Sequence, residues 1–348
     1  LLSKRLNMSL KNLNANKIPR VLQKKITNKK IKSLLKLFEK ELIIRENFAV
    51  AVSGGPDSLA LAFLAKIYSV KYKLNVKFFT VDHRLRKEST EEAKKVKKLL
   101  KILNINAEIL SWIGKKPKKN IQSIARKKRY DLLFSRCKKY KINNLLIGHH
   151  LDDLYENFFI RIIRGSGLKG LASLGKINQL NNIKIIRPLL NFDKSDLIFI
   201  SEHIFNYFIE DPSNKDSKYT RIRIRSFIKK LQNEGFDKKK LFLTINNLRN
   251  SNQSLLFYVE KNKKLNSFFN PKKNEIILNE NFFKNPYEVI FRSMTDLIKI
   301  IGGKYNSVRG KKIDYILSKI ENNVFIKETL GGCIIKKLSQ TVIISKED

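Results

Sequence analysis

The sequence predicts an α/β fold, in which a parallel sheet is covered by helices on both faces and a smaller, mainly helical domain follows. Short, continuously apolar runs alternate with longer helical segments through the first two-thirds of the 348 residues. Strands buried on both faces have this apolar character, and parallel strands need a crossover that is usually a helix. After about Thr220 the alternation gives way to long helical segments, which indicates the second domain.

Five apolar runs are predicted to form the sheet. The run FAVAV contains no polar residue, and the run NLLIG contains one. Runs this short, with β-branched and aromatic residues and polar or glycine-bearing flanks, are typical of buried strands rather than helices. In chain order, the predicted strands are 48–52, 75–82, 107–112, 144–148 and 183–187.

Helices are predicted between these strands from their start signals. An apolar helix follows the first strand at 59–70, and the capping box STEE begins a Lys-rich helix at 89–103. Asn120 is placed to cap a helix at 120–140, and another helix begins near Asp152. Further along the chain, helices are predicted at 222–232, 238–261 and 288–301, and short strands at 333–336 and 341–345.

Composition divides the chain into three segments. Residues 1–30 form a basic, Asn-rich N-terminal extension, residues 31–219 the α/β domain, and residues 220–348 the mainly helical domain with short C-terminal strands. The extension lacks the apolar core of a signal peptide. No apolar run approaches the roughly 20 residues that a membrane-spanning helix needs. We therefore expect a cytoplasmic protein that does not enter a membrane.

Charge and cysteine content narrow the class of function. The formal net charge is +41, from 72 Lys and Arg against 31 Asp and Glu. Compositional bias toward Lys accounts for part of this excess, but its sign favours a polyanionic partner, and nucleic acid over an anionic membrane surface. Cys137 and Cys333 are far apart and neither belongs to a C-x-x-C pair, which excludes a disulfide framework and a zinc knuckle.

The hexapeptide SGGPDS follows the first predicted strand and opens the apolar helix. Such a turn directs backbone N–H groups and a helix N-terminus toward one point, where polyanions bind. Gly54 and Gly55 permit close approach to phosphate, Asp57 can hold Mg²⁺ against phosphates, and Ser58 is placed to cap the helix. A turn without ligand is the alternative. The predicted nucleotide triphosphate site comprises Ser53, Gly54, Gly55, Pro56, Asp57 and Ser58.

The string GHHLDDLYE follows the fourth predicted strand. A helix that begins near Asp152 has carboxylates in its first turn, where the helix dipole favours them. Asp153 and Glu156 share one helical face, so they could bind a metal or hold an ammonium group. His149, His150 and Asp152 could instead be zinc ligands, but adjacent histidines usually point apart and no further His or Cys is suitably spaced. Simple helix capping with surface charge is the remaining alternative.

Three arginines at alternate positions follow the loop string EDPSN at 210–214. Arg221, Arg223 and Arg225 could bind phosphates where they are exposed. On a helix they would fan around its axis, so that only two of them would serve one site. A solvated basic face is the alternative.

Taken in order, these strings resemble the tRNA(Ile)-lysidine synthetase family of pyrophosphatase-loop ATPases. The resemblance runs from Ser53 to Arg225, and TLGGC at 329–333 is similar to part of the family's C-terminal recognition domain. The family usually has Asn where this chain has Ile222. The strings that carry the resemblance are SGGPDS, VDHRLR, the pairs AR and RY at 125–130, GHHLDDLYE, RGSGLKGL, RPLL, and EDPSN followed by the arginines at 221 and 225.

The resemblance implies an adenine nucleotide α-hydrolase-like fold and a ligase that forms a carbon–nitrogen bond. ATP would adenylate the wobble cytidine of an isoleucine tRNA with a CAU anticodon, and free L-lysine would then displace AMP to give lysidine. An extruded base would have to reach the pocket. Residues 31–219 would be the ATP-binding catalytic domain, and residues 220–348 the tRNA-recognition domain. Oligomeric state is left open, with a homodimer as one option.

The resemblance also assigns roles to residues. Asp57 and its loop would bind ATP and Mg²⁺, while Asp153 and Glu156 would hold the lysine ammonium or a metal. From the residues alone, His150 is a further candidate for proton handling. The candidate contacts to phosphate or tRNA are Arg126, Arg129, Arg221 and Arg225.

Three other functions are open. A tRNA thiolase of the same superfamily normally uses paired or catalytic cysteines, and this chain has no pair. An enzyme that amidates a free nucleotide, such as NAD synthetase, shares the loop but does not account for the basic charge. A tRNA-binding protein without catalysis would not be expected to keep Asp57, Asp153 and Glu156.

Overall fold

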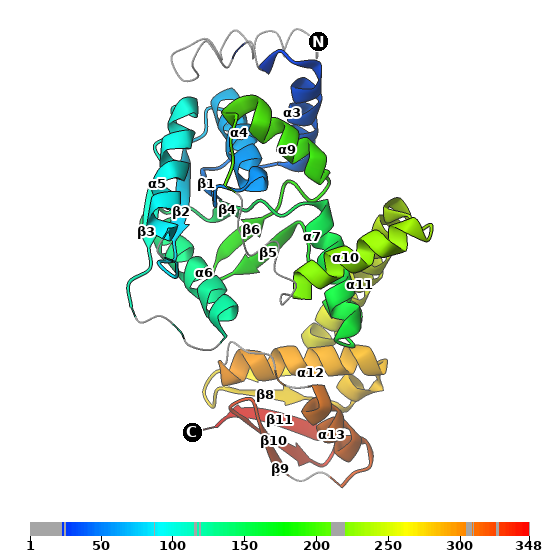
Figure 1. Cartoon of the computed structure of the whole chain (residues 1–348). Helices are drawn as coiled ribbons and strands as arrows, with labels where there is room; N and C mark the ends of the chain where they lie inside the picture. The colour runs from blue at the N-terminus through cyan, green and yellow to red at the C-terminus, as the bar shows by residue number, and fades with distance from the viewer. Residues whose placement is uncertain are drawn as a thin grey trace. The chain divides into compact units, whose positions relative to one another are not determined.

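The computed structural model, drawn in Figure 1, divides into two compact units, Leu1–Phe242 and Leu243–Asp348. The string EDPSN at 210–214 lies outside the described part of the chain. Among the described helices, none combines the length and the apolar character that crossing a bilayer requires. The structure describes residues 26–86, 88–114, 120–209, 220–303, 310–324 and 327–347, together with residues 23, 117 and 308.

A six-stranded sheet forms the centre of the first unit. Its strands are β1 (Phe48–Ala51), β2 (Val76–Asp82), β3 (Glu108–Ser111), β4 (Asn144–Leu146), β5 (Ile177–Leu180) and β6 (Ile183–Ile186). Their order is β3-β2-β1-β4-β6-β5. Every neighbouring pair is parallel except β5 with β6. The mostly parallel sheet that the sequence predicted is confirmed.

Helices cover both faces of this sheet, as expected. The helices of the first unit are α3 (Lys29–Glu41), α4 (Pro56–Lys71), α5 (Ser89–Leu100), α6 (Ile121–Lys139), α7 (Leu151–Ile163), α8 (Leu168–Leu171), α9 (Lys194–Phe205) and α10 (Thr220–Asn233). One apolar cluster joins α3, α4, α5 and α9 to one face, and a second joins α6 to the other. Phe48 and Val50 of β1 belong to the first cluster and Ala49 to the second, because successive strand residues point to opposite faces.

Some elements of the first unit were not predicted. β5 has the sequence INQL and is largely exposed, so it lacks the apolar run by which the other strands were recognised. α3 begins at Lys29, where the side chain of Asn28 accepts hydrogen bonds from Lys30 N and Ile31 N. Part of the segment 1–30 that was assigned to an extension therefore folds with the first unit.

Two predicted helix caps lack the expected side-chain hydrogen bond, although Asn120 does occupy the N-cap position of α6. The hydroxyl of Ser89 donates to Asp82 Oδ1 at 2.9 Å instead of accepting from the start of α5. Asn120 adopts a left-handed conformation before α6 and makes no side-chain capping bond. In the first case a buried carboxylate, 1% exposed, competes with the local cap for the hydroxyl.

The division between the units follows α10. The sequence placed the change at 220, whereas the first unit extends to Phe242. α10 packs against α7, with the rings of Phe227 and Phe159 5.7 Å apart. The first unit includes α10 because of these contacts, and the helix α11 (Lys238–Asn266) begins there and continues in the second unit.

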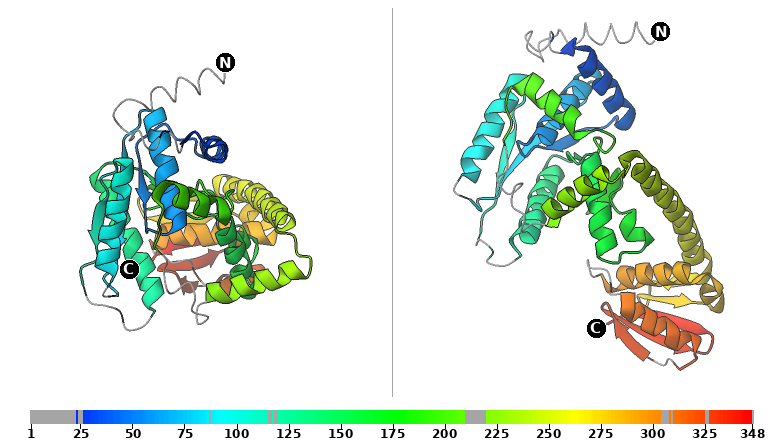
Figure 2. Two further views of the ribbon diagram at one scale, coloured as in Figure 1. Left: turned by 45° about the horizontal axis from the view of Figure 1, so that its top comes forward. Right: turned by 45° about the vertical axis from the view of Figure 1, so that its right-hand side comes forward.

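The second unit contains a five-stranded antiparallel sheet and helices, shown from two further directions in Figure 2. Its remaining elements are β7 (Ser267–Asn270), β8 (Glu275–Leu278), the 3₁₀ helix η3 (Glu280–Lys284), α12 (Tyr287–Gly302), α13 (Gly310–Glu321), β9 (Lys327–Leu330), β10 (Cys333–Leu338) and β11 (Thr341–Lys346). The order of the strands is β7-β8-β11-β10-β9. Apolar residues of α12 and α13 pack on this sheet. The two predicted tail strands correspond to β10 and β11.

We expect Gly302→Ala to destabilise the second unit. A Cβ at Gly302 would lie 2.2 Å from the carbonyl oxygen of Gly331 and 3.1 Å from Cys333 Sγ. Backbone would have to move, so the free energy of unfolding should fall by about 3 kcal/mol, the upper part of the range for overpacking. The measurement is denaturant unfolding followed by circular dichroism.

Gly310→Ala is the matched control for this variant. Its Cβ would meet Phe291 at 3.5 Å, an ordinary contact, and alanine has a higher helix propensity than glycine. This variant should be as stable as the parent or more so. Equal losses in the two variants would contradict the proposed packing of α12 against the turn before β10.

Candidate active site

Chemistry-bearing residues gather at the carboxyl ends of β1, β4 and β6, which are neighbours in the sheet. Residues 53–58 follow β1, residues 148–156 follow β4, and Arg187 follows β6. Because these three strands run parallel, their carboxyl ends lie at one edge, where ligands of open α/β sheets bind. The two motifs recognised in the sequence therefore belong to one site.

The turn after β1 is closed by the hydroxyl of Ser58. Its Oγ accepts hydrogen bonds from Ser53 N at 3.1 Å and Gly54 N at 3.0 Å, and it donates to the carbonyl oxygen of Gly55 at 2.9 Å. The helix cap is Gly55, with Pro56 as the first residue of α4. The expectation that Ser58 caps the helix is therefore wrong, because its hydroxyl bonds back into the turn.

Gly54 has no room for a side chain. Its φ is +94°, and a Cβ there would lie 2.5 Å from Val96 Cγ2 and 3.0 Å from Ile209 Cδ1. The carbonyl oxygen of Gly54 also accepts a hydrogen bond from Ile209 N at 2.9 Å. The turn is thus fixed between α5 and the segment after α9, and its backbone conformation requires glycine.

Asp57 lies in the first turn of α4 and is partly exposed. Lys194 Nζ, at the start of α9, lies 2.6 and 2.7 Å from its two carboxylate oxygens. His150 Nε2 lies 3.6 Å from Asp57 Oδ2. The sequence had not singled out Lys194, since nothing in its local pattern connects it with a residue so far away in the chain.

His150 begins α7 and is 4% exposed. Its Nδ1 accepts a hydrogen bond from Asp152 N at 3.2 Å, while its own backbone N–H donates to Asp153 Oδ2 at 3.0 Å. An Nδ1 that accepts leaves the hydrogen of the neutral ring on Nε2. That atom lies 3.6 Å from carboxylate oxygens of both Asp57 and Asp153, so His150 is oriented as a donor between two carboxylates.

Asp153 and Glu156 have different partners. Arg221 Nη1 lies 3.7 Å from Asp153 Oδ1, whereas Glu156, 1% exposed, accepts a hydrogen bond from Arg225 Nε. Burial acts to raise the pKa of Asp153, but the hydrogen bond from His150 and the charge of Arg221 are among the effects that leave it lowered. Burial raises the pKa of Glu156 despite Arg225. Within the described residues, Glu156 Oε2 is buried without a hydrogen-bond partner.

Arginines of α6 lie beside this carboxylate group. The guanidinium carbons of Arg126 and Arg129 lie 5.2 and 5.6 Å from the centroid of the Tyr130 ring. Burial lowers the pKa of Arg129, and the charges of Arg126 and Arg221 act in the same direction. Arg221 forms an ion pair with Asp153, but Arg126 and Arg129 form none with the described carboxylates. The α6 pair is therefore available to an anionic ligand.

His149, which the sequence suggested only as a possible zinc ligand, contacts the same group of charges. Its Nδ1 accepts a hydrogen bond from Arg187 Nε at 3.2 Å. Burial lowers the pKa of His149 to about 3. The charge of Asp153 acts to raise this pKa, and the charges of the nearby arginines act to lower it further. His149 is thus a neutral ring among charged side chains. The string RPLL, which begins at the last residue of the predicted strand 183–187, was the signal that could have drawn attention to Arg187.

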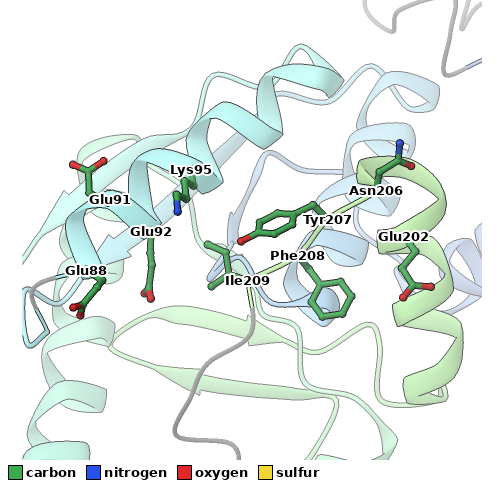
Figure 3. A pocket seen from close by; sticks show the side chains of 9 residues that line it. All are labelled: Glu88, Glu91, Glu92, Lys95, Glu202, Asn206, Tyr207, Phe208 and Ile209. Atoms are coloured by element: carbon green, nitrogen blue, oxygen red, sulfur yellow. The ribbon is translucent and has the colours of Figure 1, made fainter.

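A hollow of about 800 Å³ flanks the turn (Figure 3). Ile209, which lines it, is the residue that donates to Gly54 O. Glu88, Glu91 and Glu92 line one side of the hollow, and Tyr207 and Phe208 line the other together with Glu202. The lining residues are Glu88, Glu91, Glu92, Lys95, Glu202, Asn206, Tyr207, Phe208 and Ile209.

Comparison with known proteins gives the family. A PP-loop domain model matches residues 24–232. The tRNA(Ile)-lysidine synthase of Orientia tsutsugamushi is 36% identical over 311 residues, which cover 86% of this chain and 69% of that protein. The chain belongs to the tRNA(Ile)-lysidine synthase family. The tRNA(Ile)-lysidine synthase of Rickettsia akari is 35% identical, and the alignment covers 86% of this chain and 69% of that protein. The synthase of Wolbachia pipientis wMel is 36% identical, and the alignment covers 86% of this chain and 70% of that protein.

A solved structure shares the fold. The U34-tRNA thiolase of Methanococcus maripaludis, determined with its [4Fe-4S] cluster, aligns with a TM-score of 0.54 at 19% identity and covers 65% of this chain and 78% of its own. At this identity the likeness concerns the fold alone. The PP-loop model and the related synthases confirm the predicted α/β fold and the predicted family. They also confirm the enzyme class, a ligase that forms a carbon–nitrogen bond. ATP use follows from the PP-loop domain.

The structure brings most of the candidate residues of this family member together. His150 Nε2 lies 3.6 Å from a carboxylate oxygen of Asp57 and of Asp153, and Arg221 reaches Asp153. Arg225 of α10 and the buried Glu156 of α7 form a separate ion pair. Ser53, Gly54, Gly55, Pro56 and Ser58 form the turn itself. What each of these residues binds stays a prediction.

We expect Gly54→Ala to destabilise the first unit. Left-handed backbone costs an alanine about 1–2 kcal/mol, and contact with Val96 and Ile209 adds overpacking of about 1–3 kcal/mol. The free energy of unfolding should therefore fall by about 2–5 kcal/mol, measured by chemical denaturation. Gly55→Ala is the control: its φ is −72° and its nearest neighbour, Ile209 O, lies 3.9 Å from the new Cβ. A loss in Gly55→Ala as large as in Gly54→Ala would refute this account of the turn.

His149 should make the protein less stable in acid. Its pKa of about 3 lies below the ordinary value of 6.5, so the unfolded chain binds a proton between these values and the folded chain does not. Stability then falls as pH falls from 6.5 toward 3, by at most about 1.4 kcal/mol per pH unit for one proton. Unfolding measured from pH 7 to pH 4 should show a shallower slope in His149→Gln. An unchanged slope would mean that His149 is already protonated near its ordinary pKa in the folded protein.

Proposed function

We propose that the chain joins the side-chain amine of L-lysine to C2 of the wobble cytidine in an isoleucine tRNA with a CAU anticodon. In the first step, the carbonyl oxygen at C2 forms a bond to the α-phosphorus of ATP, and pyrophosphate leaves. In the second step, the deprotonated amine forms a bond to C2, the bond from C2 to oxygen breaks, and AMP leaves with that oxygen. The amine gives up its remaining surplus proton, and the product is lysidine.

The observation that supports this proposal is that the turn after β1 lies beside the first turn of α7. A phosphate-binding type of turn ends in Asp57, and Asp57 lies 3.6 Å from His150 Nε2, as does Asp153. An anion-binding segment and a pair of acidic side chains are thus side by side. That combination suits a reaction in which a triphosphate and an amine must meet at one base.

Phosphate groups have complementary partners at this edge. The N-terminus of α4 and the guanidinium groups of Arg126 and Arg129 favour negative charge. The two arginines lie close enough for their charges to act on each other. We assign them to the phosphates of ATP or of the anticodon, and we assign Arg221 and Arg225 to the same polyanionic substrates once their carboxylates have other partners.

Mg²⁺ would bind Asp57 in place of the present partner of its carboxylate, Lys194. Mg²⁺ needs only one or two carboxylates when phosphate oxygens and water complete its octahedron. Among the described residues, no group of three or more His, Cys, Asp or Glu could hold a metal by itself, which agrees with a site completed by substrate. Both oxygens of Asp57 now contact Lys194 Nζ, so the metal would replace this ammonium, and Lys194 would be free to contact phosphate. Bound Mg²⁺ would neutralise charge on the phosphates.

The lysine ammonium suits the acidic face of α7. Glu156 Oε2 is buried without a hydrogen-bond partner within the described residues, and the charge of Asp153 is near enough to raise the pKa of Glu156. An ammonium group brings three donors and would satisfy such an oxygen. His150 is less suited to take the proton from the amine, because its Nδ1 already accepts and its Nε2 carries hydrogen.

A tRNA thiolase is the second candidate, and the cysteines speak against it. Burial raises the pKa of the Cys137 thiol to about 12, so the thiolate that carries sulfur would hardly form. Cys333 is 0% exposed and hydrogen-bonds to the carbonyl oxygen of Ile298 in the second unit. For the ligase we also propose a cytoplasmic location, since tRNA, ATP and lysine occur together there.

Incorporation of radiolabelled lysine tests the proposed function. The protein is incubated with ATP, Mg²⁺, labelled lysine and a tRNA transcript with a CAU anticodon, and the label in tRNA is counted. Label should appear with this anticodon and be absent when the wobble base is not cytidine. No label with the CAU transcript would refute the proposal, and sulfur transfer to tRNA by the same protein would favour the thiolase.

We expect Asp57→Ala to lower the rate of this incorporation by about 10²- to 10³-fold, the usual loss when one charge-stabilising group is removed. Binding to tRNA should stay within about twofold, because a surface of net charge +41 provides that affinity. Filter binding at several salt concentrations measures it. As a control, Lys194→Met removes the partner of Asp57 but keeps the carboxylate. Full activity in Asp57→Ala would show that the turn has another role.

A further inference from the structure

Arg187 is a buried arginine that the proposed reaction does not use. It is 6% exposed and lies directly after β6. Its Nη1 donates to the carbonyl oxygen of Gly175 at 2.8 Å and to Asn178 Oδ1. Its Nε donates to His149 Nδ1 at 3.2 Å. Burial lowers its pKa, but a guanidinium stays protonated at any pH at which the protein is folded.

These contacts determine which nitrogen of His149 carries hydrogen. An arginine offers only donors and no acceptor. Nδ1 of His149 must therefore present a lone pair to Arg187 Nε–H, and the hydrogen of the neutral ring must be on Nε2. The charged groups near this ring are Arg126 and Arg129 of α6, Asp153 of α7, and Arg187 itself. Burial lowers the pKa of His149, and the arginine charges lower it further against the opposing charge of Asp153, so the ring does not take a second proton near neutral pH.

We propose that Arg187 is a positioning residue for His149: by donating to Nδ1, it fixes the neutral ring with hydrogen on Nε2, so that His149 can donate a hydrogen bond to the anionic group bound beside Arg126 and Arg129. His149 then transfers no proton. It contributes a neutral donor with a fixed orientation, which stabilises charge as it develops on an oxygen. The proposal rests on the proposed function in one respect only, namely that the bound group is a phosphate-bearing substrate.

A purely structural role is the competing explanation. Through Nη1, Arg187 joins the loop at Gly175 to β5, where Asn178 lies. Removal of the whole side chain would break this connection as well as the bond to His149. A useful test must therefore remove one without the other.

Two variants separate these roles. Gln places its Nε2 the same number of bonds from Cα as the Nε of Arg, so Arg187→Gln can keep the N–H donor to His149 Nδ1. Met has a similar length and no donor, so Arg187→Met loses that bond. Both variants lose the Nη1 contacts equally. Asn178→Ala is the reverse control, since it removes one partner of Nη1 and leaves the Nε contact in place.

The tautomer is measured by side-chain ¹⁵N NMR with ¹⁵N-labelled histidine. The chain has only four histidines, so spectra of His149→Gln assign the signals. We expect hydrogen on Nε2 of His149 in the parent protein, in Asn178→Ala and in Arg187→Gln, and a tautomer mixture in Arg187→Met. Inorganic pyrophosphate, used as an anionic probe, should shift the Nε2 signal in the first three proteins.

The rate of single-turnover lysine incorporation gives the functional readout. Arg187→Met should be slower than Arg187→Gln by about tenfold to a hundredfold, the usual effect of removing the partner that orients a functional histidine. The KM for lysine should be alike in the two variants. Equal rates in the two folded variants, or a parent protein with hydrogen on Nδ1, would overturn the proposal.

Failure of the proposed function would look different. In that case the parent protein would not incorporate lysine at all, yet the NMR spectra would still report the tautomer and its response to pyrophosphate. If Arg187→Met does not fold, the comparison of the parent with Arg187→Gln still decides: the proposal requires the Nε2–H tautomer in the parent, and its absence refutes it.

Discussion

The candidate site depends on one hydroxyl group. Ser58 Oγ accepts hydrogen bonds from the backbone N–H groups of Ser53 and Gly54 and donates one to the carbonyl oxygen of Gly55. A turn this short, between a buried strand and a helix, must satisfy its backbone groups locally, and this hydroxyl does so without a loop of extra residues. Since the turn is closed on itself, Asp57, the second residue of α4, projects from a fixed helix start. A Cβ at Gly148 would lie only 3.3 Å from the Asp57 backbone, so β4 can bring His150 close.

Charges at this edge are balanced in pairs that ligands can exchange. Asp57 contacts Lys194, Asp153 contacts Arg221, and Glu156 contacts Arg225. A buried carboxylate without a partner would cost several kcal/mol, so these pairs keep the site stable before any substrate arrives. Each pair consists of one group suited to an amine or a metal and one suited to phosphate. A triphosphate and an amine can therefore enter by replacing partners, and each of these three carboxylates has a counter-charge in their absence.

The sequence predicted those structural features that depend on residues close together in the chain. Apolar runs gave the parallel strands, and the two strand-end motifs gave Asp57 and Asp153, because strand ends of a parallel sheet must share an edge. Lys194 could not be predicted, since it meets Asp57 across 137 positions of sequence. The caps assigned to Ser58 and Ser89 failed for a related reason: a hydroxyl bonds to the best available partner, and here that partner was the turn itself in one case and buried Asp82 in the other.

The paired histidines show how much the surroundings of a residue decide its chemistry. Both accept a hydrogen bond at Nδ1, His149 from Arg187 and His150 from the N–H of Asp152. In each neutral ring the hydrogen is then on Nε2, and neither ring has a free lone pair for a metal. This argues against the zinc interpretation of the His-His-x-Asp string on grounds of bonding. It also gives the two rings distinct tasks, because the Nε2 of His150 lies between Asp57 and Asp153, whereas His149 is surrounded mainly by arginines. A donor toward carboxylates organises the protein, and a donor among cations has an anionic substrate as its natural partner.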